Sequence, residues 1–388
     1  MKYFIKTFGC QQNIADSERL AGYYENRGFS RTENYDEANL AVINTCVIRQ
    51  KSEDKAYGLI KNLDKARKSG KNFKIVVTGC LVGTAIHDKT GKMMRLLKRK
   101  LPEVDEFLPS DEVGFENNAI RQSRDHAWVP ISNGCNNFCS FCIVPFSRGR
   151  EKSRPFDKII DEINKLTDRG YTKVTLLGQN VNSYGADLVV NNKKFASRYN
   201  LNIKPVTVKH LGRYRLATLF PPLLKEICKN KKIKNLSFVS SNPWDFSEEL
   251  IETIAGNEQI DRIIHLPVQS GSNRILKVMN RWYTKRDYLE LIKKIKSKIH
   301  DCEFTTDIIV GFPGETEKDF LETLDLVKKV HFTKAFIACF SARPNTLAAK
   351  LVDNVTSLEK KKRFHILDKY VNHRPNIKIP IWLKGAPS

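Results

Sequence analysis

The chain lacks the features that would place it in or across a membrane. No stretch of its 388 residues approaches the roughly 20 consecutive apolar side chains that a spanning helix needs. Its start, Met1–Lys6, is too short and too interrupted by lysine to form a secretory signal peptide. Because 41% of the residues are hydrophobic, we expect a globular protein. We also expect it to be located in the reducing cytoplasm and to have no membrane partner.

Acidic residues are also scarce. Asp and Glu number 43 against 66 Lys and Arg, which leaves a formal net charge of +23. Such an excess either serves solubility in a lysine-rich composition or attracts a polyanionic partner, usually a nucleic acid. Charge alone does not separate these two interpretations.

Three of the nine cysteines stand in one short loop, at Cys135, Cys139 and Cys142. Thiolates at this CxxxCxxC spacing can converge on a soft metal centre such as zinc or an iron–sulfur cluster. A closed zinc site needs a fourth ligand, and the nearest histidine, His126, precedes the loop. Disulfides do not suit a chain of this length without a secretory segment. The loop therefore predicts a [4Fe-4S] cluster with one iron open to a substrate or cofactor.

Residues 1–115 predict a small parallel α/β domain. Nearly continuous apolar runs are typical of strands covered on both faces, and a helical pattern follows from Asp16. Because parallel strands share one C-terminal edge, cysteines that follow these strands are expected to gather there as a second three-thiolate site. The alternative is three ordinary half-buried cysteines. The predicted strands are Tyr3–Phe8, Leu40–Asn44 and Lys74–Thr78, followed by Cys10, Cys46 and Cys80.

Residues 116–345 predict a second domain, because strand and helix patterns alternate from Trp128 onward. Six β/α repeats indicate a (β/α)6 partial barrel with its chemistry at the C-terminal ends of the strands. The cysteine loop follows the first strand, as this arrangement requires. The predicted strands are Trp128–Ser132, Lys173–Gly178, Leu236–Ser240, Arg262–Leu266, Phe304–Val310 and Ala335–Phe340, and the predicted helices are Phe156–Asp168, Ser247–Ala255, Arg286–Ile299 and Glu317–Val330.

Polar residues and glycines follow the later barrel strands. Neutral donors and acceptors suit ribose, carboxylate and adenine groups, and Gly lets the backbone approach a ligand. His265 by itself is better interpreted as a hydrogen-bonded structural residue than as a ligand. The candidate cofactor-binding residues, with one member from the cysteine loop, are Phe141, Gln179, Asn180, Ser240, Gln269 and Gly311.

A basic segment follows the cysteine loop. Arginine forks bind phosphate in a bidentate manner, so Arg148, Arg150 and Arg154 are candidate substrate-binding residues for an RNA backbone. The alternative is a solvated loop with ion pairs to Glu151 and Asp157.

Four other features complete the description of the chain. Residues 101–125 predict a linker, and 187–215 predict an inserted basic loop. The tail after Tyr370 contains three prolines and is too short for a sizeable domain. No ligand-like spacing surrounds Cys228, Cys302 or Cys339. Two of them, Cys228 and Cys339, lie in apolar runs, which predict packing residues.

The two cysteine triads together resemble the radical S-adenosylmethionine (SAM) methylthiotransferase family. The run from Gly134 to Glu151 is similar to the tRNA branch of that family, as are the strand-end segments Gly178–Tyr184, His265–Ser272 and Asp307–Glu315. The similarity covers residues 1 to about 350. It implies two [4Fe-4S] clusters and SAM as cofactors.

The resemblance also implies a reaction. The cluster on Cys135, Cys139 and Cys142 is expected to cleave SAM to a radical that abstracts hydrogen from C2 of N6-(dimethylallyl)adenosine at position 37 of tRNA. The cluster on Cys10, Cys46 and Cys80 is expected to carry the sulfur of the methylthio group. Implied partners are the tRNA anticodon loop, an electron donor such as flavodoxin or ferredoxin, and a sulfur donor, with the chain acting as a monomer.

Members of the family usually end in a small RNA-binding β-barrel. Residues 346–388 are expected to be a short C-terminal segment in which that barrel is absent. Two alternatives stay open at this stage. One is a methylthiotransferase acting on threonylcarbamoyladenosine in tRNA or on a ribosomal protein. The other is a non-catalytic RNA-binding protein with an iron–sulfur or zinc site.

Overall fold

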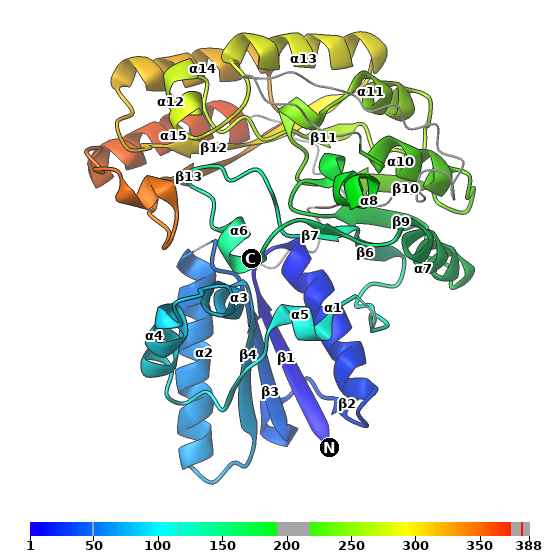
Figure 1. The fold of residues 1–388 in the computed structure, drawn as a ribbon, viewed down its shortest axis with the longest axis vertical. Coiled ribbons are helices and arrows are strands. Elements are labelled where there is room, and N and C mark those ends of the chain that lie inside the picture. The colour runs from blue at the N-terminus through cyan, green and yellow to red at the C-terminus, as the bar shows by residue number, and fades with distance from the viewer. Residues whose placement is uncertain (49, 116, 192–217, 374–381, 383–388) are drawn as a thin grey trace.

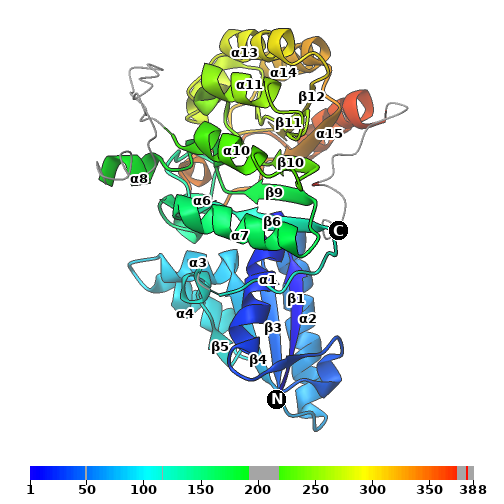
Figure 2. The same cartoon turned by 90° about the vertical axis from the view of Figure 1, so that its right-hand side faces the viewer.

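The computed structural model describes residues 1–48, 50–115, 117–191, 218–373 and 382. It divides into an N-terminal α/β domain and a larger domain of β/α repeats, drawn one above the other in Figure 1 and Figure 2. None of the helices in the described part of the chain combines the length and the apolar content of a membrane span.

The N-terminal domain is built on a five-stranded parallel sheet in the order β2-β1-β3-β4-β5. One face packs against α1 and α5, and the other against α2, α3 and α4. The strands are β1 (Lys2–Phe8), β2 (Ser30–Arg31), β3 (Leu40–Thr45), β4 (Lys74–Gly79) and β5 (Glu106–Phe107), and the helices are α1 (Gln11–Glu25), α2 (Gln50–Lys68), α3 (Cys80–Ile86), α4 (Lys92–Lys100) and α5 (Ser110–Val113). The three predicted strands are confirmed to within a residue or two.

In this domain the predicted helix from Asp16 is confirmed but starts earlier, and the predicted linker is wrong. Helix α1 begins at Gln11 instead of Asp16, because Asn13 and Cys10 form a capping box that starts the helix directly after the cysteine. The predicted linker 101–125 contains β5 and α5. Its acidic patch is structural, since the Asp105 carboxylate accepts a 2.7 Å hydrogen bond from the Ile75 amide on β4.

The second domain contains the six predicted parallel strands, arranged as two three-stranded sheets, β10-β9-β6 and β11-β12-β13. An isolated parallel bridge between Leu236 and Ile260 links the two halves of this partial barrel. The strands are β6 (His126–Pro130), β9 (Lys173–Leu177), β10 (Asn235–Phe238), β11 (Ile263–His265), β12 (Glu303–Val310) and β13 (Lys334–Cys339), and β7 (Ser132–Asn133) pairs with β8 (Lys152–Ser153) as a small hairpin.

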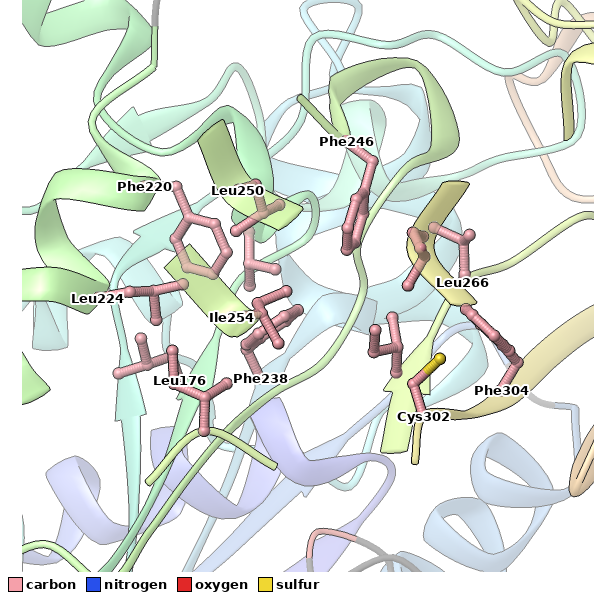
Figure 3. Packing of buried hydrophobic residues seen from close by; sticks show 14 of the residues in the cluster. Leu176, Phe220, Leu224, Phe238, Phe246, Leu250, Ile254, Leu266, Cys302 and Phe304 are labelled. Atoms are coloured by element: carbon pink, nitrogen blue, oxygen red, sulfur yellow. The ribbon is translucent and has the colours of Figure 1, made fainter. Parts of the chain in front are cut away.

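Helices cover the outside of the partial barrel (Figure 1). Their apolar faces and the strands enclose the largest core cluster, part of which is drawn in Figure 3 with Leu176, Phe238 and Phe304. The longer helices are α7 (Phe156–Asp168), α10 (Phe220–Cys228), α11 (Glu248–Ala255), α13 (Lys285–Lys298), α14 (Glu317–Val330) and α15 (Ser357–Asn372), and shorter ones are α6 (Val144–Ser147), α8 (Ala186–Asn191) and α12 (Asn273–Val278).

Helix α15 extends the barrel domain beyond the predicted limit of residue 345. The Asn372 side chain donates to the Ala335 carbonyl of β13 at 2.8 Å and accepts from the Ala335 amide at 3.1 Å. The predicted loop 187–215 starts within α8, which is helical to residue 191. The rest of that loop, 192–215, and most of the predicted tail lie outside the described residues.

The cysteines without ligand-like spacing divide into two kinds. Cys228 and Cys302 are buried in the main core cluster, which confirms the packing role predicted for Cys228. The same prediction for Cys339 is wrong, because its side chain is exposed. Strand β13 is the outer strand of its sheet, so an apolar strand run there does not guarantee burial.

One buried histidine predicts a pH dependence of stability. Burial lowers the pKa of His126, whose Nε2 lies 2.8 Å from Thr175 Oγ1, from about 6.5 to about 4. The unfolded chain therefore binds a proton at a higher pH than the folded chain, and stability falls as the pH drops below 6.5. We expect this histidine to remove roughly 2 kcal/mol of unfolding free energy between pH 7 and pH 5. Denaturant titrations of the wild type and of His126→Gln at both pH values measure it. An equal loss in both proteins would contradict the assignment.

Candidate active site

The three cysteines that follow β1, β3 and β4 meet at the C-terminal edge of the N-terminal sheet. The Cys46 thiol lies within hydrogen-bonding reach of the Cys80 sulfur, and Cys10 interacts electrostatically with both. The hydrogen bond to Cys80 and burial raise the pKa of Cys46, whereas the same hydrogen bond and Arg148 lower the pKa of Cys80. The predicted second triad is therefore assembled in space.

A glycine brings the backbone close at this edge. Gly79 directly precedes Cys80 and has a φ of 89°, a region that L side chains rarely adopt. A Cβ at this position would overlap the side-chain oxygen of Asn44 and the backbone of Thr45. The tight approach of β4 to the end of β3 is what places Cys80 beside Cys46.

The CxxxCxxC cysteines form the other triad in the loop after β7. Burial and interactions with Cys139 and Cys142 raise the pKa of Cys135, and burial and Cys139 raise that of Cys142 to about 12. A residue outside the loop also holds it in place, since the Asn280 side chain donates a hydrogen bond to the Phe138 carbonyl at 2.9 Å. Phe138 itself has a φ of 48°, a left-handed conformation that is uncommon for an aromatic residue.

Each triad receives a guanidinium that the sequence patterns did not predict for this role. Arg281 Nη1 donates to Cys139 Sγ at 3.4 Å, and Arg148 Nε donates to Cys80 Sγ at 3.2 Å. Both arginines are buried, and Arg281 is fixed further by the Pro267 carbonyl at 2.9 Å. Charged donors favour the thiolate form of sulfur, which is the form that binds metal.

Close packing of α3 on α6 brings the two triads into one region between the domains. Helix α3 begins with Cys80, and α6 follows Cys142 by one residue. A Cβ on Gly83 would overlap the carbonyl oxygen of Ser147, so only glycine permits this approach. Arg148 then reaches from the end of α6 to Cys80.

The donor sets fit iron–sulfur clusters in their chemistry. No group of three or more His, Cys, Asp and Glu side chains in the described ranges is arranged to hold one metal ion. All six thiols are free, and each triad is made of sulfur donors alone, as clusters require.

The ends of the later barrel strands carry unusual backbone conformations. Ser240, Gln269 and Gly311 follow β10, β11 and β12 with φ values of 67°, 68° and 65°. Positive φ in non-glycine residues stores strain, and such strain is concentrated at functional sites. The three positions are among the predicted cofactor-binding residues, and the polar pattern of the sequence did not reveal their backbone geometry.

The remaining predicted cofactor-binding residues differ in their surroundings. Asn180 is buried and donates to Asp245 at 2.6 Å, while its Oδ1 has no hydrogen-bond partner in the described structure. Gln179 is half-buried beside it. Phe141 packs in a small apolar cluster with Phe312 and Phe340. A ligand that donates a hydrogen bond, such as a ribose hydroxyl or an amino group, would satisfy this unpartnered buried acceptor at the strand end.

The structure places the three basic residues after the loop in different roles. Arg148 and Arg154 are buried and paired with Asp16 and Glu162 at 2.6 and 2.7 Å, instead of Glu151 and Asp157. Arg150 is exposed and lies 4.4 Å from the centre of the Phe138 ring. His265 is bonded to Thr305 at 3.0 Å, as expected for a structural histidine.

Helix α15 holds the loop that follows β12. Glu315 accepts from the Gly311 amide at 2.9 Å and pairs with Arg363 at 2.6 Å, and both side chains are almost fully buried. We expect Arg363→Met to lower the unfolding free energy by about 3–5 kcal/mol, because the Glu315 charge is left buried and unpaired. Urea titration measures the change. The exposed Arg286, replaced in the same way, is the control and should lose less than about 0.5 kcal/mol; equal losses would contradict the assignment.

Comparison with known proteins agrees with this fold and site. A profile of the radical SAM superfamily matches residues 129–327, and one of Uncharacterized protein family UPF0004 matches residues 2–97. Among solved structures, the radical SAM methyltransferase TsrM from Kitasatospora setae has a TM-score of 0.56 at 13% identity, over 90% of this chain and 77% of that chain. The barrel and its cysteine loop thus define a radical SAM domain.

Curated relatives narrow the class. The tRNA-2-methylthio-N6-dimethylallyladenosine synthase of Thermotoga petrophila is 41% identical over 97% of this chain and 83% of its own length. The proteins of the same name from Thermoanaerobacter pseudethanolicus and Clostridium perfringens are 41% and 38% identical, over 94% and 97% of this chain and 76% and 83% of their own lengths. The chain belongs to the tRNA-2-methylthio-N6-dimethylallyladenosine synthase family of radical SAM methylthiotransferases.

Proposed function

We propose that the protein adds a methylthio group to C2 of N6-(dimethylallyl)adenosine at position 37 of tRNA. The observation that carries this proposal is the pairing of two three-cysteine sites in one interdomain region, each with a guanidinium on one of its thiols. The names of the relatives supply the substrate. When bound, the clusters and SAM supply radical formation and the sulfur and methyl groups, which are chemistry that side chains lack.

The chain's own residues would position these groups. Cys135, Cys139 and Cys142 would hold one cluster, and Arg281 would stabilise its negative charge through Cys139. Asn180, Ser240, Gln269 and Gly311 would bind SAM with neutral polar groups, with Gln179 and Phe141 beside them. Cys10, Cys46 and Cys80 would hold the other cluster, supported by Arg148.

The RNA would approach the exposed basic surface next to these sites. We assign the phosphate contact to Arg150 and to the neighbouring exposed Lys152. An anticodon loop is single-stranded, so its bases can enter a pocket at little unpairing cost. An electron donor and a sulfur donor complete the proposed partners, and action as a monomer stays a prediction.

Nucleoside analysis tests this proposal directly. Mass spectrometry of digested tRNA from cells with and without the gene should show the methylthiolated dimethylallyladenosine only when the gene is present. The unthiolated nucleoside should accumulate in its absence. Loss of a methylthiolated threonylcarbamoyladenosine instead, or an unchanged nucleoside profile, would overturn the assignment.

A further inference from the structure

A cavity of about 570 Å³ lies between the two domains, next to the Cys10–Cys46–Cys80 triad. It opens between α1 and α5 of the N-terminal domain and the β7–β8 hairpin of the barrel domain, three elements that lie near the domain boundary in Figure 1. Asp16 is the one carboxylate residue among its described lining residues. The cationic side chains that line it are Arg19, Arg148, Arg150, Lys152 and Arg154.

Around this cavity, buried arginines outnumber buried carboxylates. Three carboxylates are each engaged at short range by an arginine other than Arg19. Arg121 contacts both Glu18 and Glu162, and Arg154 also contacts Glu162. Arg148 forms an ion pair with Asp16 at 2.6 Å. Four arginines therefore share three acids, and one arginine has no carboxylate of its own.

Arg19 is the arginine left over. It is only 5% exposed, and its Nη1 lies 3.8 Å from Asp16, which Arg148 and Gln12 already engage. No hydrogen bond from its guanidinium to another described residue is formed; the Phe115 ring lies 4.9 Å away. Burial and the neighbouring Arg154 lower the pKa of Arg19 to about 10. A buried guanidinium that lines a cavity without a hydrogen-bond partner is a donor that an anion would satisfy.

The cavity adjoins the second triad but not the strand ends of the barrel. Arg148 forms part of its wall and donates to Cys80 Sγ at 3.2 Å, and Thr78 and Gly79 of β4 also line it. Asn180, Ser240, Gln269 and Gly311 are not among its lining residues. It is therefore distinct from the place assigned to SAM, and it reaches the triad from the α1–α5 side.

We propose that this interdomain cavity binds a low-molecular-mass ligand with an oxyanion group on Arg19, beside the Cys10–Cys46–Cys80 triad. Arginine forks match oxyanions in charge and geometry, and the volume lies in the range of small-molecule sites. The choice of ligand rests on the proposed function, which consumes one sulfur atom for each product. On that basis the site is suited to a sulfur-bearing anion of the thiosulfate class. Phosphate shares the oxyanion chemistry without the sulfur.

Thermal unfolding of the purified chain, without SAM or RNA, tests the site. Sodium chloride is replaced at constant ionic strength by sodium thiosulfate or by sodium phosphate. We expect thiosulfate to raise the unfolding temperature of the wild type, because a ligand of the folded state stabilises it by mass action. The rise should be absent in Arg19→Gln and reduced in Arg19→Lys, which keeps the charge but loses the fork. Arg27→Gln, at an exposed arginine just after α1, is the control and should keep the rise.

The outcomes are separable. A rise confined to thiosulfate supports the sulfur-bearing ligand, and equal rises with both salts support a general oxyanion site. Equal rises in the wild type and Arg19→Gln would overturn the proposal. The proposal would also be overturned if Arg19→Gln bound an anticodon stem-loop more weakly than the wild type while neither small anion had an effect. That result would assign Arg19 to an RNA phosphate. Because the thermal unfolding assay contains neither SAM nor RNA, retained anion binding with no methylthiolated product would refute the proposed function alone.

Discussion

Replacing Cys135, Cys139 and Cys142 together by alanine is expected to abolish SAM cleavage. The three thiols are the sulfur donors of their loop, and they interact with one another. We expect 5′-deoxyadenosine formation by the anaerobically reconstituted protein to fall by about 1,000-fold or more, equivalent to at least about 4 kcal/mol of activation free energy. Chromatography of the reaction mixture measures it.

The exposed Cys339 provides the control for this experiment. Cys339→Ala removes a thiol from the same domain but from outside both triads, and it should keep the wild-type rate. A triple variant that still forms 5′-deoxyadenosine at a rate near that of Cys339→Ala would show that the loop does not carry the chemistry.

Replacing Cys10, Cys46 and Cys80 by alanine is expected to separate the two halves of the reaction. This triad lies in the other domain and is joined to the loop triad through the α3–α6 contact and Arg148. We expect 5′-deoxyadenosine formation to stay within about tenfold of the wild type, because the two thiol sets are distinct. The methylthiolated nucleoside should fall below detection in mass spectra of tRNA digests, because the sulfur site is lost.

The pattern across the two triple variants is more informative than either alone. Loss of both readouts in the Cys10, Cys46 and Cys80 variant, with a folded N-terminal domain by circular dichroism, would mean that this triad also supports SAM cleavage. Full product formation would remove it from the mechanism.

Much of the fold could be predicted from the sequence because the central strands are long and buried. The runs that became β1, β3 and β4 are apolar along most of their length, and β3 is buried at every residue. The same parallel topology that the runs predict brings Cys10, Cys46 and Cys80 to one edge. The edge strands β2 and β5 were missed because they have two residues each, which is too short to show a period.

The arginines of the site were harder to predict, because their partners are distant in sequence. Arg148 is 132 residues from Asp16 in the chain, and Arg281 is 142 residues from Cys139. No local pattern distinguishes such a residue from an exposed arginine. The local basic run alone predicts Arg148 and Arg154 as phosphate contacts, and it does not reveal that both are buried and paired with Asp16 and Glu162. Arg19 lies on a helix whose sequence gave no sign of a cavity behind it.

Iron and sulfide analysis of the reconstituted protein, combined with Mössbauer spectroscopy, tests the central claim most directly. If both triads hold clusters, the chain should bind about eight iron and eight sulfide ions. Each triple-alanine variant should then retain about half, with the spectrum of one [4Fe-4S] cluster. A wild-type protein that reproducibly binds only one cluster, or that binds zinc in place of iron, would contradict it.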